Sequence, residues 1–187
     1  SSHAICYVHS MIGLAFARQG QGAPDEASRA ILEAMEYVTR MQNYDLIETV
    51  NAAAAELAVR QSRLDDGLVW LAANRYDTAL DVAIHFYLPM LASVRVLLAS
   101  GTDANLAAAN IRLARAADIA GRTHNIHLLL QVLVLEAALS EAVGDRHGAL
   151  AALGKAVWLA EPSGGQRVFL DQGPTLGRLL DMLEVEG

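Results

Sequence analysis

The chain has 187 residues, of which 53% are apolar, 5% are aromatic and one is a cysteine, and its formal net charge is −7. This length predicts one domain with a continuous core, the lone cysteine excludes an internal disulfide and a cysteine-based zinc site, and the acidic balance argues against direct binding of nucleic acid. Because the aliphatic runs are shorter than the ~20 residues that span a bilayer, we expect no membrane contact and a cytoplasmic location.

The first two predicted helices form a pair separated by a break at Gly20-Gln21-Gly22. They cover about residues 4–19 and 24–41, and Pro24 stands at the first helical position that proline favours. Within the second helix, a small, a large and a small residue at offsets of four and three share one face. These residues are Ala27, Ile31 and Ala34.

A second pair follows at about residues 46–61 and 64–74, with Ser62 at its turn. Asn43 or Asp45 is the expected N-cap of its first helix. An alanine run at residues 52–55 leaves room for a neighbouring backbone to approach closely. The second helix repeats the small-large-small spacing in degenerate form, at Gly67, Leu71 and Asn74.

The stretch from Arg75 to Tyr87 is less regular and precedes Pro89, which is tolerated near a helix start but kinks a helix interior. We expect a short helix or loop here that bends the chain between two halves. The alternative is one long kinked helix that Asp77 caps.

Four further helices are predicted at about residues 89–100, 104–121, 125–143 and 144–162. Gly101 and Gly144 end the first helix of each pair, and Gly121 ends the second helix of the earlier pair. The second helix of each pair again carries the small-large-small spacing. The residues concerned are Ala107, Ile111 and Ala114 in one pair, and Ala149, Leu153 and Ala156 in the other.

The small first residues Ala27, Gly67, Ala107 and Ala149 lie 40, 40 and 42 positions apart. A recurring period of this length predicts an all-α solenoid of about four stacked helix pairs. The turn Gly144-Asp145 and the spacing behind it resemble a tetratricopeptide repeat, and a HEAT-like array is the architectural alternative. We therefore expect a tetratricopeptide-like helix-pair superhelix over residues 1–162, followed by a C-terminal capping segment over residues 163–187 that carries Val168, Phe169 and Leu170.

The segment AEPSGGQRVFLDQGPTLGRLL, preceded by SVRVLLASG and LARAADIAGR, resembles the last sensor segment of MalT-like, LuxR-family transcription activators. The resemblance covers residues 88–180 well and residues 5–74 through repeat spacing. It implies a regulator with an ATPase module, a repeat sensor for an inducer and a helix-turn-helix module. The sequence has no phosphate-binding loop and no helix pair for DNA after Leu183, so ATP and DNA are expected only through missing domains, with no cofactor in this fragment.

The tetratricopeptide register places the first helix of each pair on a concave groove, which is the expected site for a small-molecule inducer. The side chains that this register points into the groove are Tyr7, Ser10, Arg18, Thr49, Glu56, Arg60, Arg95, Gln131 and Glu141. Arg95 is the strongest candidate because its helix is otherwise apolar and a guanidinium suits carboxylate, phosphate or sugar hydroxyls. The alternative is an arginine that pairs with a neighbouring glutamate.

Three polar residues, His9, Asn51 and Glu136, fall at packing positions of the same register, where they need hydrogen-bond partners. His124 and His127 are three residues apart but lack a third metal ligand at a suitable spacing. Cys6 and the acidic pair at residues 65–66 have no adjacent base or nucleophile. We expect no metal site and no enzyme activity.

Two functions fit this sequence. In the first, the groove is a small-molecule sensor that regulates the missing modules. In the second, it is a protein-docking scaffold that recognises a peptide or drives self-association.

Overall fold

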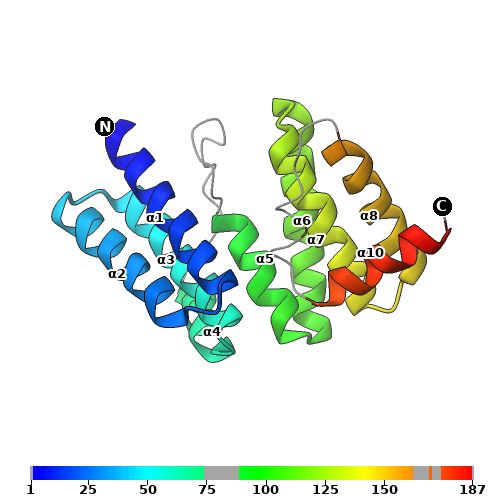
Figure 1. Ribbon diagram of the computed structural model, residues 1–187, viewed down its shortest axis with the longest axis horizontal. Coiled ribbons are helices and arrows are strands. Elements are labelled where there is room, and N and C mark those ends of the chain that lie inside the picture. The colour runs from blue at the N-terminus through cyan, green and yellow to red at the C-terminus, as the bar shows by residue number, and fades with distance from the viewer. Residues whose placement is uncertain (1, 74–88, 162–168, 170–173, 187) are drawn as a thin grey trace. The chain divides into compact units, whose positions relative to one another are not determined.

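The computed structural model describes residues 2–73, 89–161, 169 and 174–186. Over these residues the chain forms α-helices joined by short turns and contains no strand, which confirms the all-α prediction (Figure 1). The helices are α1 (Ser2–Gly20), α2 (Pro24–Arg40), α3 (Tyr44–Arg60), α4 (Leu64–Ala73), α5 (Pro89–Ser100), α6 (Asp103–Thr123), α7 (Ile126–Ala142), α8 (Arg146–Ala160) and α10 (Pro174–Glu186).

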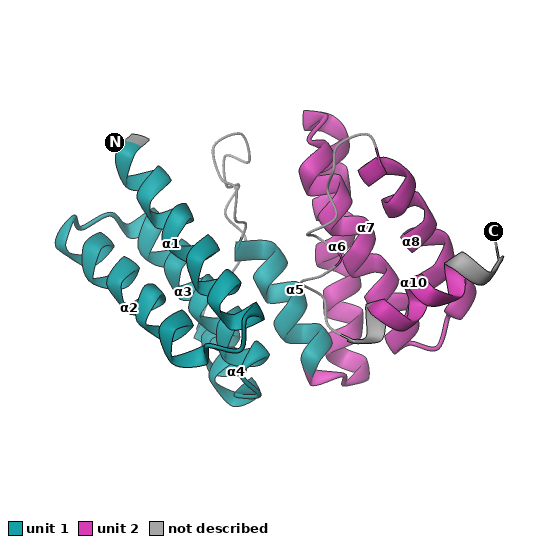
Figure 2. Cartoon of the chain, in the orientation of Figure 1, with its two compact units in different colours: residues 1–99 teal, residues 100–187 magenta. Residues whose placement is uncertain are grey.

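The chain divides into two compact units, residues 1–99 and residues 100–187 (Figure 2). The boundary falls at the end of α5. The predicted connector at residues 75–87, with both of its alternatives, lies outside the described residues. The boundary that we expected at residue 162 stays a prediction.

The first unit is built on the packing of α1, α2 and α3 against one another, with α4 packed on α3. Most of its core side chains are small or β-branched, which lets the helix backbones approach closely. Most of the core positions in α2 follow the predicted face of Ala27, Ile31 and Ala34. The core consists of Ala4, Val8, Ile12, Ala15, Ala27, Ala30, Ile31, Ala34, Val38, Leu46, Val50, Ala53 and Leu57.

In the second unit, α7 packs against both α6 and α8, and α10 packs against α7 and α8. Leu179 of α10 is buried in the core of α7 and α8, and Phe169 packs against the same core. Phe169 and α10 therefore pack on the last helix pair. Val168 and Leu170, which we expected to share this role with Phe169, lie outside the described residues.

In the described part of the chain, six residues at helix ends have a left-handed backbone conformation. They are Gly22, Gln42, Ser62, Gly101, His124 and Gly144. After all but Gly101, the next N–H donates to the carbonyl five residues earlier at 2.8 to 3.3 Å, which is the Schellman arrangement. The predicted break at Gly20-Gln21-Gly22 is confirmed, with Gly20 as the last residue of α1 and Gly22 as the left-handed position. The predicted stop at Gly121 is wrong, because Gly121 lies inside α6 and the left-handed position is His124.

The N-caps follow directly after these turns. Asn43, and not Asp45, caps α3 by accepting a hydrogen bond from the Leu46 N–H at 3.2 Å. The Asp145 carboxylate caps α8 by accepting from the Gly148 N–H at 2.9 Å. Each cap satisfies a backbone donor that the helix itself cannot pair.

The predicted register of α6 is wrong by two residues. Ile111 is 72% exposed, and Ala107 and Ala114 are exposed as well. The buried small-large-small set is instead Ala109, Leu113 and Ala116. Both sets have the same spacing in an alanine-rich helix. The buried set begins seven residues after the Thr102 N-cap, whereas in α8 it begins four residues after Asp145, so α6 has about one extra turn at its start.

Candidate functional site

Three charged side chains of the first unit meet at one carboxylate oxygen. Oε1 of Glu56 accepts hydrogen bonds from Nη2 of Arg60 at 2.7 Å and from Nε of Arg60 at 3.2 Å. Nε of Arg95 lies 3.4 Å from the same oxygen. The Arg60 guanidinium also lies over the ring of Phe16, 4.7 Å from its centroid. We call these four residues the arginine cluster.

The arginine cluster is assembled from the first helices of three successive pairs. Phe16 comes from α1, Glu56 and Arg60 from α3, and Arg95 from α5. Glu56 and Arg60 are four residues apart and therefore neighbours on the surface of α3. Val94 and Val96, on either side of Arg95, are fully buried. The cluster thus lies on the helix layer that the tetratricopeptide register assigns to the groove.

The electrostatics of the arginine cluster follow from its burial. Glu56 is only 2% exposed, and a carboxylate that is taken out of water needs charged or hydrogen-bonding partners. The side chains of Arg60 and Arg95 retain 22% and 14% exposure. Two guanidinium groups and one carboxylate give these three side chains a combined charge of +1.

The structure brings three of the predicted groove residues, Glu56, Arg60 and Arg95, into contact. It also contains the alternative that we gave for Arg95, a pairing with a neighbouring glutamate. The two roles are compatible, because the side chains of Arg60 and Arg95 are both partly exposed. Ligand contact by these residues stays a prediction.

Tyr7 and Arg18 of α1 are directed to α2 instead. The ring of Tyr7 lies 4.5 Å from that of Tyr37, centroid to centroid, and Nε of Arg18 lies 3.2 Å from Oε2 of Glu26. Tyr7 is about 180° around the helix from Phe16 at 100° per residue. One face of α1 therefore cannot present both Tyr7 and Phe16 to α3.

The other predicted groove positions of the first unit do not extend the cluster. Ser10 is exposed. Thr49 is fully buried, and its hydroxyl donates to the Asp45 carbonyl at 3.0 Å. A hydroxyl that pairs with its own helix in this way contributes to packing.

In the second unit, the predicted groove residues Gln131 and Glu141 both lie on α7 and are partly buried. Oε1 of Glu141 accepts a hydrogen bond from Nη2 of Arg146 at 3.3 Å. On the same helix, burial raises the pKa of the Glu136 carboxyl, while the charge of Lys155 acts in the opposite direction. A carboxyl of this kind holds its proton to higher pH than an exposed glutamate.

Two further polar residues occupy the packing positions that we identified. Nδ1 of His9 lies 2.8 Å from the Ile5 carbonyl oxygen, so the polar group at this position has the partner that burial requires. Asn51 is partly buried and lines a pocket of the first unit.

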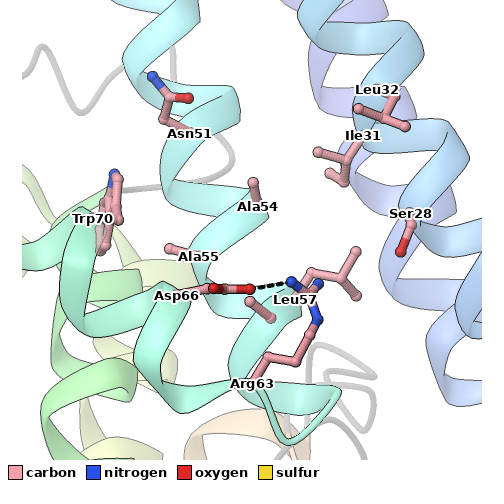
Figure 3. A pocket seen from close by; sticks show the side chains of 11 residues that line it. Ser28, Ile31, Leu32, Asn51, Ala54, Ala55, Leu57, Arg63, Asp66 and Trp70 are labelled. Carbon is pink, nitrogen blue, oxygen red and sulfur yellow. Dashed lines mark hydrogen bonds and ion pairs between the residues drawn. The ribbon is translucent and has the colours of Figure 1, made fainter.

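That pocket lies between α2, α3 and α4 and has a volume of about 340 Å³ (Figure 3). Apolar side chains such as Ile31 and Leu57 form most of its wall, with Trp70 at one side. Arg63 and Asp66, which form an ion pair, also line it. Asn51 and Glu56 are five residues apart on α3, so they point to opposite sides of that helix, at about 140°.

Phe16 is the one member of the arginine cluster that was not predicted. The sequence signal for it is the spacing of Ile5, Ile12 and Phe16, which puts the aromatic ring on the buried side of α1. This spacing does not reveal which cation the ring meets.

The remaining candidates are surface features. Cys6, His124 and His127 are all exposed. Among the described residues, no group of three or more His, Cys, Asp or Glu side chains is placed to hold a metal ion. In the same part of the chain, no helix combines the length and the hydropathy needed to cross a bilayer.

The model of one protein family, the MalT-like TPR region, matches residues 2–186 of the chain. The match covers both compact units and the helices that carry the arginine cluster. No curated protein and no solved structure matches.

Proposed function

The chain belongs to the family of MalT-like TPR regions, and from this membership we propose that it is the effector-sensing region of a MalT-type transcription regulator of the LuxR class. In this role it binds a small molecule and passes the bound state to the ATPase and helix-turn-helix modules of the regulator. The effector binds on the layer formed by α1, α3 and α5. Contact with DNA and ATP belongs to those other modules.

The arginine cluster is the observation that carries this proposal. Burial of a carboxylate with two guanidinium groups costs desolvation free energy, and apolar residues of similar volume often stabilise a fold as well or better. A cluster of this kind on the predicted ligand face is therefore explained better by recognition than by stability. Arginine side chains that are partly exposed and held beside one carboxylate are preorganised for binding.

A thermal-shift screen against a metabolite panel tests this function. A ligand present at about 100 times its dissociation constant stabilises the folded protein by about 2.7 kcal/mol, which is readily measured as a rise in melting temperature. A metabolite that stabilises the wild type is then titrated into both the wild type and an Arg60→Gln variant. If no metabolite of the panel stabilises the wild type, this result argues against the sensor function.

A second candidate function is protein docking, which helical repeats of this type generally serve. The pocket beside Trp70 favours it, because the pocket is mostly apolar and the nearby side chain of Leu32 is 62% exposed. Leu32→Glu should then abolish capture of a partner protein and leave metabolite binding unchanged. Co-purification of a partner without any metabolite shift would favour this scaffold function.

Helical-repeat regions of this kind are typically non-catalytic, and we propose that the chain acts by binding alone. We expect it to need no cofactor and to work in the cytoplasm. Self-association through a helix face is the remaining partner prediction, and size-exclusion chromatography with light scattering measures it directly.

A further inference from the structure

We propose that the pocket between α2, α3 and α4 is a separate small-molecule site, and that its ligand is a neutral molecule with an aromatic ring. The pocket has a volume of about 340 Å³ (Figure 3), which falls in the range of about 300–1,000 Å³ that small-molecule sites occupy. Its residue Asn51 and Glu56 of the arginine cluster point to opposite sides of α3. The inference therefore does not depend on the proposed effector site.

Alanine side chains of α3 create the space for this pocket. α2 and α4 both pack on α3, but within the described residues these two helices are not in contact with each other. Between them, α3 contributes Ala54, Ala55 and Ala58 to the pocket wall, and their single methyl groups do not fill the gap. A pocket bounded by three helices encloses a small ligand on several sides, as most ligand sites do.

The other walls are mostly apolar and include one aromatic ring. α2 contributes Ile31 and Leu32, and α4 contributes Trp70 (Figure 3). The Leu32 side chain is 62% exposed, so a ligand that covers it removes apolar surface from water. Aromatic pairs prefer offset-stacked or edge-to-face arrangements, which contribute beyond the area that they bury. The indole of Trp70 therefore favours a ligand with a ring of its own.

The polar side chains of the pocket favour a ligand without net charge. Arg63 and Asp66 form an ion pair with each other, so the charges that line the pocket cancel. The other polar side chains that line it, Ser28 and Asn51, are uncharged. An anionic ligand would meet Asp66, a cationic ligand would meet Arg63, and each would also lose part of its hydration. A neutral molecule avoids both costs.

Two probes with the same ring skeleton test this inference. N-phenyl-α-naphthylamine is neutral and aromatic, and its derivative anilinonaphthalene sulfonate carries an additional negative charge. Both fluoresce in apolar surroundings and accept excitation energy from tryptophan. The chain has 2 tryptophans, so Trp158→Phe, which changes a 75% exposed side chain of the second unit, leaves Trp70 as the energy donor. Binding is measured in this background as energy transfer from Trp70 to each probe.

Ala54→Leu places a larger side chain in the pocket and is the main variant. Ala54 is only partly buried, so the substitution disturbs the core less than one at a fully buried alanine, and circular dichroism establishes that the variant is folded. Ala152→Leu, at a partly buried alanine of α8, is the matched control in the second unit. Asp66→Asn changes an exposed side chain and removes the carboxylate that balances Arg63. This variant tests the inference independently if Ala54→Leu does not fold.

The neutral probe should give saturable energy transfer and should bind more tightly than its sulfonated derivative. Ala54→Leu should weaken binding of the neutral probe by at least about tenfold, whereas Ala152→Leu should leave it unchanged. Asp66→Asn should raise the affinity of the sulfonated probe relative to that of the neutral probe by about two- to fivefold.

Three results would overturn the inference: no saturable transfer, equal binding of the neutral probe in Ala54→Leu, or an unchanged ratio of the two affinities in Asp66→Asn. Tighter binding of the sulfonated probe in the Trp158→Phe background would do so as well. If neither probe binds and Leu32→Glu abolishes capture of a partner protein, the pocket is a docking surface and not a small-molecule site. The effector site at the arginine cluster is tested separately by the metabolite titration with Arg60→Gln, so the two proposals can fail independently.

Discussion

Gly67 of α4 lies against Val96 of α5 so closely that a Cβ atom at Gly67 would be 3.3 Å from both methyl carbons of Val96. The same Cβ would be 2.9 Å from Cγ2 of Val59. Valine has a stiff χ1, so neither neighbour can move aside easily. Gly67 thus permits a close approach of helices that a larger residue would prevent.

Gly67→Ala should therefore destabilise the protein, by about 1–2 kcal/mol, although alanine favours helix more than glycine does. Gly121→Ala in α6 is the matched control, because outside the local helix backbone no atom lies within 4 Å of a Cβ built there. It should stabilise by about 0.5–1 kcal/mol. Urea denaturation of both variants measures the two effects, and stabilisation by both would contradict the close contact.

The register of α6 gives a second pair of variants. Ala109→Leu inserts a large side chain at a fully buried position and should cost about 1–3 kcal/mol. Ala107→Leu, on the exposed side, should change the free energy of unfolding by less than about 0.5 kcal/mol. A larger cost for Ala107→Leu than for Ala109→Leu would instead support the register that the sequence pattern predicted.

Removal of the Glu56 carboxylate tests the stability of the arginine cluster. Glu56→Ala removes the carboxylate that pairs with both Arg60 and Arg95, and it should cost about 3 kcal/mol, while Glu56→Gln should cost about 1–2 kcal/mol. Glu26→Ala, which breaks the exposed pair with Arg18, should cost less than about 1 kcal/mol. Equal costs for Glu56→Ala and Glu26→Ala would mean that the buried ion pairs of Glu56 stabilise the fold no more than an exposed pair does.

The left-handed turns predict opposite effects at two equivalent positions. His124 has φ 53° and Gly144 has φ 84°. His124→Gly relieves the steric cost of a Cβ atom in this conformation, whereas Gly144→Ala introduces it, and each change should be about 1 kcal/mol. Thermal melting in both variants measures this, and shifts in the same direction would count against the left-handed assignment.

The raised pKa of Glu136 predicts a pH effect of defined sign. As the pH rises above the usual value of 4.5, the unfolded chain loses this proton before the folded chain does. The contribution of Glu136 to stability is therefore fully present below that pH and is lost as the pH rises through the folded-state pKa. Glu136→Gln lacks this loss, so the variant should gain stability relative to the wild type between pH 4 and pH 7. Urea denaturation at both pH values measures the difference, and a constant difference would rule out burial of the carboxyl.

Local chemistry made the helices and most of their ends predictable. Pro24, Asn43 and Asp145 act through hydrogen bonds or φ values within a few residues of themselves, so the sequence contains all that is needed to place them. The register of α6 could not be found in this way, because Ala107 and Ala109 begin identical spacings. Which of the two is buried depends on where α7 lies.

The arginine cluster was predictable only in part. Repeat spacing indicated that Glu56, Arg60 and Arg95 belong to first helices, because the period assigns each helix to a layer. It did not indicate that both arginines share one oxygen of Glu56, since that depends on the height at which α5 packs beside α3. The rotation of α1, which turns Tyr7 to α2 and Phe16 to α3, is likewise set by packing.

The Schellman turns also bear on how the chain folds. Each is closed by a hydrogen bond that reaches back only five residues, and the helices that it joins are neighbours in sequence. Closing such short loops costs little entropy, so the pair α1 and α2 can form before α3 docks. Chains with contacts this local fold in microseconds to milliseconds. In native-state hydrogen exchange, we expect the amides of α1 and α2 to open together as one cooperative unit.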